Sequence, residues 1–126
     1  VSHGISLAKL AGAKVVGVTV SVPMRRAITS SLSAEMLASI SANNSAAIKR
    51  SLGAVEAAAK AAGVPCETLE IEDEHPYQGI INAATKKKAD LIVMASHGRR
   101  GLSAVILGSE THKVVTHTDI PVLIYR

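Results

Sequence analysis

The stretch that decides the fold lies near the carboxyl end of the chain and reads LIVMASHGRRGLSAVILGS from residue 91 to residue 109. Its first four apolar residues predict a buried strand, and a loop punctuated by glycines follows. Ser109 then stands where the next helix is expected to begin. Backbone N–H groups at a helix N-terminus carry partial positive charge, so a strand, loop and helix start of this kind favours phosphate binding.

The composition of the loop supports an anionic ligand. Its glycines let the backbone approach a ligand closely, and Arg99 and Arg100 add donors suited to phosphate geometry. The loop matches neither the Walker pattern nor the dinucleotide fingerprint, because no Gly-Lys-Ser follows and no Gly-x-Gly-x-x-Gly is present. The role of His97 stays open between donating to phosphate and bracing the turn.

Outward from this loop, helical and strand patterns alternate along the chain. Helices are expected at residues 2–11, 33–62, from 76 onward, and 109–116, and strands at 14–20, 66–71, 90–95 and 122–125, with a loop at 21–32. Alternation of this kind predicts an α/β fold with an open, mostly parallel twisted sheet and helices on both faces. The length of 126 residues corresponds to one domain, residues 1–126.

Composition excludes several classes of function. The hydrophobic fraction of 48% excludes a disordered chain, and the aromatic fraction of 2% argues against a base-stacking platform for single-stranded nucleic acid. The net charge of +4 comes without a dense basic tract, so no specific nucleic-acid partner is expected. With a single cysteine, no signal peptide and no apolar run long enough for a membrane, we expect a cytoplasmic protein.

Catalytic and metal-binding arrangements are not evident. Ser96 beside His97 is not a catalytic pair, because adjacent residues cannot readily point a nucleophile and a base at one another. His112 and His117 are five residues apart and so do not share a helix face as metal ligands would. The acidic residues between 67 and 74 leave two interpretations open, a solvated strand end and a Mg²⁺ site beside a nucleotide.

From Asp90 onward, the chain resembles the universal stress protein family. Nucleotide-binding members of that family carry Gly, two residues, Gly, nine residues, and then Gly-Ser or Gly-Thr. Gly98, nine intervening residues, Gly108 and Ser109 match this spacing, whereas Ala95 replaces the first glycine. The flanking apolar segments at 90–94 and 120–125 also resemble the family, and the likeness extends more weakly over the whole chain. The resemblance implies a flavodoxin-like or adenine-nucleotide α-hydrolase-like fold.

The resemblance also implies where a nucleotide would bind. Val20 would line the adenine pocket, residues 95–101 would wrap the ribose and phosphates, and the helix starting at Ser109 would present donors to the outer phosphates. The implied nucleotide-binding residues are Val20, Ala95, Ser96, His97, Gly98, Arg99, Arg100, Gly101, Gly108, Ser109, Glu110 and Thr111. The family's first strand, which lies in the middle of the sheet, has no counterpart in these 126 residues. We therefore expect a gap of two strand spacings, about 10 Å, within the sheet.

The resulting hypothesis is a cytoplasmic stress-response protein that binds ATP or another adenine nucleotide, with or without Mg²⁺, and acts as a dimeric sensor or regulator. The final apolar strand at residues 121–126 invites pairing with a second chain, and the resemblance implies an antiparallel homodimer there. Beyond slow ATP hydrolysis, no enzymatic activity is expected. Two alternatives stay open: an interaction dimer of the same fold that binds no nucleotide, and an enzyme using ATP for adenylyl transfer.

Overall fold

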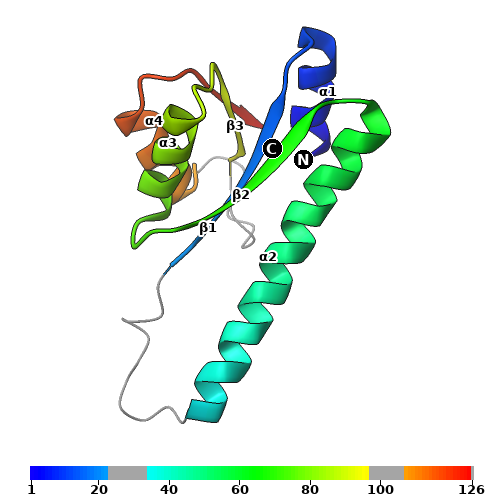
Figure 1. Ribbon diagram of the computed structural model, residues 1–126. Coiled ribbons are helices and arrows are strands. Elements are labelled where there is room, and N and C mark those ends of the chain that lie inside the picture. Colours follow the sequence, from blue (N-terminus) through cyan, green and yellow to red (C-terminus); the bar gives the residue numbers. More distant parts are fainter. Residues whose placement is uncertain (23–33, 97–106, 126) are drawn as a thin grey trace.

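The computed structural model of the protein describes residues 1–22, 34–96 and 107–125, in which helices and strands alternate (Figure 1). The elements are α1 (Ser2–Ala11), β1 (Val15–Ser21), α2 (Ala34–Ala62), β2 (Cys66–Glu72), α3 (Pro76–Lys86), β3 (Ile92–Ala95), α4 (Ser109–His117) and β4 (Val122–Tyr125). Their bounds lie within two residues of those predicted wherever the prediction named both ends. The predicted alternation of helices and parallel strands is confirmed.

β1 and β2 form a parallel pair whose register runs from Val15 opposite Cys66 to Ser21 opposite Glu72. The β-branched residues of β1 fit the pleated surface of a sheet. Gly17 interrupts this run, and a Cβ added there would lie 2.9 Å from Cγ1 of Val55 in α2. The missing side chain therefore allows α2 to pack directly against β1.

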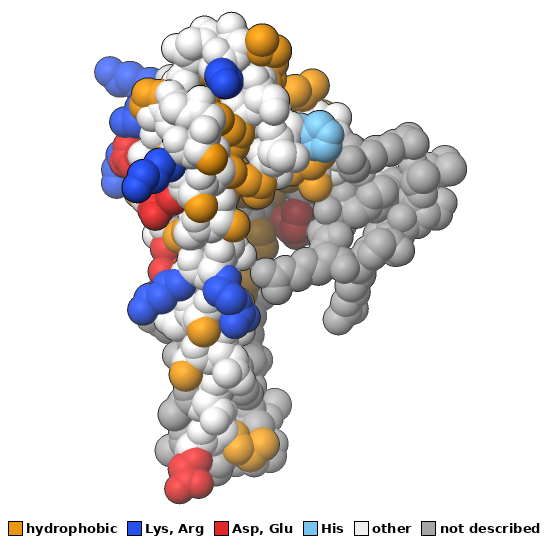
Figure 2. Space-filling view, turned by 90° about the vertical axis from the view of Figure 1, so that its right-hand side faces the viewer, with side chains coloured by type: hydrophobic (Ala, Val, Ile, Leu, Met, Phe, Trp, Pro, Cys, Tyr) orange, Lys and Arg blue, Asp and Glu red, His pale blue; other side chains and the backbone are white. Residues whose placement is uncertain are grey.

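One face of the β1–β2 pair is covered by α1 and the carboxyl-terminal part of α2. The buried residues Ile5, Ala8, Ala59 and Val64 form a core there. Because two of these are alanines, helices and strands can approach closely. Figure 2 shows the outer surface of α2, with charged side chains at intervals along its length. None of the described helices is both long and apolar enough to cross a bilayer.

α3 and α4 cover the opposite face of the sheet (Figure 1). A Cβ on Gly79 of α3 would lie 2.9 Å from both methyl groups of Val20, so this helix packs closely against β1. β3 and β4 are also parallel, with Ile92 opposite Val122. Val114 of α4 is fully buried.

The sheet is divided between β1 and β3. β1 pairs with β2 and β3 pairs with β4, and no strand of the described residues joins the two pairs. This interruption falls where the predicted gap was placed. Helix α1 spans it: a Cβ on Gly4 would lie 3.5 Å from Cγ1 of Val93, while Ile5 belongs to the core beneath β1. The N-terminal ammonium of Val1 also donates to the Tyr125 hydroxyl at 3.0 Å.

Candidate functional site

The carboxyl ends of β1 and β3 lie at the same end of the molecule. Val20, near the end of β1, packs against α3. The start of α3 is joined to the start of α4, because Tyr77 N–H donates to Glu110 Oε2 at 3.0 Å. α4 is joined in turn to the end of β3, where the Thr111 hydroxyl donates to the Ala95 carbonyl at 2.9 Å. These contacts place Val20 and Ala95, predicted to contact opposite parts of a nucleotide, at one end of the fold.

Ser96 and Gly108 form the neck of the loop between β3 and α4. Gly108 N–H donates to the Ser96 carbonyl with an N···O distance of 2.7 Å, so the residue before the loop and the residue after it are in direct contact. Ser96 is only 6% exposed, and neighbouring Thr111 is 4% exposed. Hydrogen bonds protected from water in this way hold their partners firmly. The loop's two ends are therefore fixed relative to β3 and α4.

The middle of this loop lies outside the described residues. Five of the predicted nucleotide-binding residues fall there, namely His97, Gly98, Arg99, Arg100 and Gly101. Their contacts with a ligand stay predictions. The other predicted residues are described, and they gather around the neck, the start of α4 and the end of β1.

The amino terminus of α4 has backbone N–H groups that the helix itself does not use. Gly108 occupies the N-cap position with φ −58° and ψ 149°, and no side chain caps the helix. The first helical hydrogen bond runs from His112 N–H to the Gly108 carbonyl at 2.9 Å. The N–H groups of Ser109, Glu110 and Thr111 precede that bond and have no acceptor within the helix. Together with the exposed Ser109 hydroxyl, they can receive an anion.

The Thr111 hydroxyl, predicted as a donor to phosphate, is used inside the fold instead, and the Glu110 carboxylate also makes contacts within the fold. The Thr111 hydroxyl donates to the Ala95 carbonyl and so braces α4 against β3. The Glu110 carboxylate accepts from Tyr77 N–H and pairs with Lys113 Nζ at 3.4 Å. This arrangement supplies α3 with a carboxylate at its N-terminus, where negative charge is favourable. Only the backbone N–H groups of these two residues point to a ligand-binding role.

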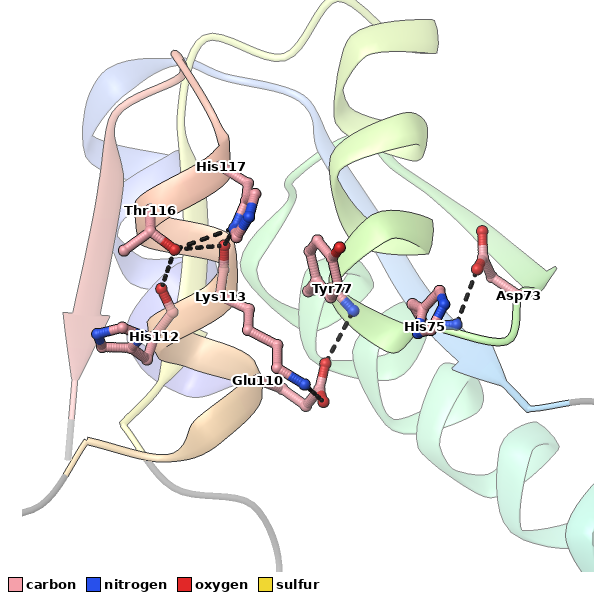
Figure 3. A network of polar contacts seen from close by, with 8 residues as sticks. All are labelled: Asp73, His75, Tyr77, Glu110, His112, Lys113, Thr116 and His117. Atoms are coloured by element: carbon pink, nitrogen blue, oxygen red, sulfur yellow. Dashed lines mark hydrogen bonds and ion pairs between the residues drawn. The ribbon is translucent and has the colours of Figure 1, made fainter.

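A ring cluster around this brace was missed by the sequence analysis (Figure 3). The Tyr77 ring lies 5.0 Å from the His117 ring and 6.1 Å from the His75 ring, measured between centroids. Lys113 Nζ lies 5.8 Å from the Tyr77 centroid, within the range of a cation–π contact. Asp73 Oδ1 accepts from His75 N–H at 2.8 Å. The cluster joins α3 to α4, and no spacing in the sequence signals it, because β3 and a loop separate these helices.

Glu67, in the acidic segment on and after β2, pairs with two lysines. Glu67 accepts from Lys14 Nζ at 3.1 Å and also pairs with Lys87. The hydrogen bond from Lys87, with that from Lys14, lowers the pKa of Glu67. In residues 1–22, 34–96 and 107–125, no three His, Cys, Asp or Glu side chains gather in a group that could hold a metal ion. Burial, with the nearby Glu56 charge, raises the pKa of the Cys66 thiol, which favours its neutral form.

Comparison with known proteins agrees with the fold. A family model described as the Universal stress protein family matches residues 1–126. The chain belongs to this family. A universal stress protein of Thermus aquaticus is 41% identical over 64 residues, which are 51% of this chain and 47% of that relative. The Bacillus subtilis universal stress protein YxiE is 44% identical over 64 residues, 51% of this chain and 43% of YxiE. The matched stretch thus spans less than half the length of these curated relatives.

Solved structures of the family share the architecture. The crystal structure of a universal stress protein in complex with cAMP superposes with a TM-score of 0.67 and 22% sequence identity, covering 99% of this chain and 82% of that one. At this identity the likeness shows the fold alone. The expected α/β architecture of a universal stress protein is thereby confirmed.

Proposed function

We propose that this protein binds an adenine nucleotide at the carboxyl ends of β1 and β3 and acts as a dimeric stress-response sensor or regulator. One observation carries the proposal: the Ser96–Gly108 neck presents the uncapped start of α4 to the space beyond β3. A helix start whose N–H groups have no acceptor within the helix favours phosphate. The glycine spacing of the loop and the cAMP complex of a related fold support a nucleotide as the ligand.

In this proposal each part of the site has a separate task. Val20 contributes an apolar surface for the adenine base, and the loop after Ser96 wraps the ribose and phosphates. The Ser109 hydroxyl and the N–H groups at the start of α4 hold the outer phosphates. The contacts of the Glu110 carboxylate with Tyr77 and Lys113 hold its charge at α3, which lowers its repulsion toward a phosphate.

The proposed role is to hold the nucleotide rather than to transform it. The groups described at the site are backbone donors, a serine hydroxyl and an apolar side chain, which bind and orient a ligand. An ATP-using enzyme would also need a positioned general base or nucleophile. We assign neither role to a residue of this chain, and we propose ATP, with or without Mg²⁺, as the ligand to test first.

A charge placed at the start of α4 tests the nucleotide site. Ser109 is exposed at the first helical position, where a glutamate is favourable for the helix itself. Ser109→Glu should therefore fold normally but weaken ATP binding about tenfold or more, as measured by titration calorimetry. Ser109→Gln has nearly the same shape without the charge and should bind ATP much more tightly than Ser109→Glu.

Adenosine separates the possible outcomes of this experiment. It lacks phosphates, so its weaker binding should be nearly the same in both variants and in the natural sequence. Equal ATP affinity in the two variants would contradict the placement of phosphates at α4. No detectable binding of ATP at millimolar concentration would favour the alternative of an interaction dimer without nucleotide.

Dimer formation is proposed at the outer edge of β4. This strand pairs with β3 along one edge, and no other described strand pairs with it. Leu123 is 43% exposed, so an apolar side chain accompanies an unpaired edge. Leu123→Lys should shift a dimer toward monomer in light scattering after size exclusion. Leu10→Lys is the matched control, since Leu10 is 88% exposed on α1 and lies away from this edge.

A further inference from the structure

The carboxyl-terminal turns of α1, α2 and α3 lie together at the amino ends of the strands, opposite the proposed nucleotide site (Figure 1). Val15 N–H donates to the Pro65 carbonyl at 2.8 Å, which joins the turn after α1 to the turn after α2. The ammonium groups of Lys14 and Lys87 both contact the Glu67 carboxylate, and Lys87 directly follows α3. We call this end of the molecule the amino edge, and it consists of residues 9–14, 60–67, 86–92 and 119–121.

Lysine dominates the charge of the amino edge. Six lysines and three acidic residues give it a net charge of +3, the six being Lys9, Lys14, Lys60, Lys86, Lys87 and Lys88 and the three being Glu67, Asp90 and Asp119. Lys87 and Glu67 are half-buried, and the other seven side chains are exposed. Figure 2 shows basic side chains gathered toward the end of the molecule where α2 finishes. Because one carboxylate serves both Lys14 and Lys87, even this ion-paired group keeps a positive charge.

Two leucine side chains are exposed among these lysines. Leu10 is 88% exposed in the last turn of α1, and Leu91 is 41% exposed directly before β3. α1 packs on β3, where a Cβ on Gly4 would lie 3.5 Å from Cγ1 of Val93. Because α1 runs opposite to the strands, its last turn lies at the same end as the start of β3. Apolar side chains beside lysines can enter the headgroup region of a bilayer while the ammonium groups stay at its charged surface.

The residue types at the amino edge favour a lipid surface over other anionic partners. Every cation of the edge is a lysine, whose flexible side chain carries a compact charge suited to headgroups without fixed positions. Protein interfaces are instead enriched in arginine and aromatic residues and depleted in lysine. The edge also contains no aromatic residue, whereas single-stranded nucleic acid is bound by stacking on aromatic rings. Attachment to a bilayer surface needs no membrane-spanning helix.

We propose that the amino edge binds the surface of an anionic lipid bilayer, with its lysines at the headgroups and with Leu10 and Leu91 entering the interface. Each lysine near such a surface strengthens binding about fivefold. Salt weakens this attraction because it screens exposed charges. The nucleotide site lies at the opposite end and faces away from the bilayer. The inference therefore does not rest on the proposed nucleotide binding, and Ser109→Glu should bind vesicles as the natural sequence does.

Flotation of the protein with lipid vesicles tests the proposal. Phosphatidylcholine vesicles with about 30% phosphatidylglycerol supply the anionic surface, and vesicles of phosphatidylcholine alone supply the neutral one. We expect at least about tenfold stronger binding to the anionic vesicles, most of it lost in about 1 M salt, where charges are screened beyond about 3 Å. Equal binding to both kinds of vesicle, or no binding to either, would overturn the proposal.

A pair of double variants separates the amino edge from the net charge of the protein. Lys86→Gln with Lys88→Gln removes two exposed charges from the edge and should weaken binding to anionic vesicles about twentyfold. Lys49→Gln with Arg50→Gln removes the same charge from the exposed surface of α2, roughly 18 Å before that helix ends and beyond a Debye length of about 8 Å. This control should change binding less than about twofold. Equal losses in the two double variants would overturn the proposal.

The apolar contribution and the class of partner have tests of their own. Leu10→Ser should weaken binding to anionic vesicles about fivefold, because the side chain that enters the interface is lost. An unchanged affinity would overturn the placement of this leucine in the bilayer. A short DNA duplex bound as tightly as the anionic vesicles, with the same loss in the Lys86 and Lys88 double variant, would assign the edge to nucleic acid and overturn the lipid surface as its partner.

Discussion

The β1–β2 half of the molecule is held by apolar packing over a long register, whereas the β3–β4 half combines a short register with buried hydrogen bonds. β1 and β2 pair over seven residues and rest on a core that includes Ala59, which is 0% exposed. β3 and β4 pair over four residues, and the end of β3 is fixed by the buried polar residues Ser96 and Thr111.

Because of this difference, we expect the β1–β2 half to contribute most to stability and the β3–β4 half to position a ligand. Burial of apolar area is the largest favourable term in folding, so the half with α1 and α2 should dominate the free energy of unfolding. A buried hydrogen bond contributes less, about 1 kcal/mol, but fixes direction and distance. The second half uses such bonds where the loop returns to α4, which is where a ligand would need accurately placed donors.

The largest expected effect on stability comes from a charge placed in the core of the β1–β2 half. Ala59→Asp would bury a carboxylate among Ile5, Val64 and their neighbours with no partner. We expect a loss of about 4 kcal/mol or more in the free energy of unfolding, measured with urea. Ala57→Asp is the control, because Ala57 lies on the same helix but is exposed, and should cost well below about 1 kcal/mol. Similar losses in both variants would contradict the assigned core.

A smaller effect is expected where α2 meets β1. A Cβ at position 17 would lie 2.9 Å from Val55 Cγ1, so Gly17→Ala should cost about 1–3 kcal/mol of stability. Val55→Ala removes that methyl group, and the double variant should be less destabilised than the sum of the single changes. Nucleotide affinity of Gly17→Ala should stay unchanged under conditions where it is folded. Additive losses would show that the contact is not the cause.

In the β3–β4 half, we expect the loss of a hydrogen-bond donor to lower both stability and ATP binding. Thr111→Val keeps the shape of the side chain but leaves the Ala95 carbonyl without the hydroxyl that it accepts from. We expect a cost of about 1–2 kcal/mol in stability, together with weaker ATP binding because the start of α4 is less well positioned. Thr111→Ser retains the donor and should be close to the natural protein in both measurements. An unchanged ATP affinity in Thr111→Val would contradict the expectation that hydrogen bonds of the β3–β4 half position the ligand.

The smallest effect concerns the surface of the β1–β2 half. Hydrogen bonds from Lys87 and Lys14 lower the pKa of Glu67 in the folded protein. Their contribution to stability is therefore present above the unfolded pKa of this carboxyl and is lost as the pH falls through its lower folded value. Lys87→Met should raise the pKa of Glu67 toward its usual value, as followed by NMR titration of the carboxyl carbon. Lys86→Met, a change on the exposed neighbour, should leave that titration unchanged.

The bounds of the elements were predictable because local patterns encode them. β1 was predicted at residues 14–20 and is found at Val15–Ser21, a difference of one residue at each end. The position of Ser109 at the start of α4 was predicted from the loop pattern and is confirmed. The direction of the Glu110 side chain was not predictable, because the N–H group that it meets belongs to Tyr77 on another helix. Contact between α3 and α4 depends on how both pack against the sheet.

The sequence by itself determined the alternation of helices and strands, the placement of a loop with phosphate-binding spacing after β3, and the resemblance to the universal stress proteins. These follow from periodicity, glycine positions and local backbone preferences, which act over a few residues. Only the tertiary structure decided that the Thr111 hydroxyl and the Glu110 carboxylate serve the fold. Those outcomes depend on hydrogen-bond partners far away in the chain, and packing alone brings such partners together or keeps them apart.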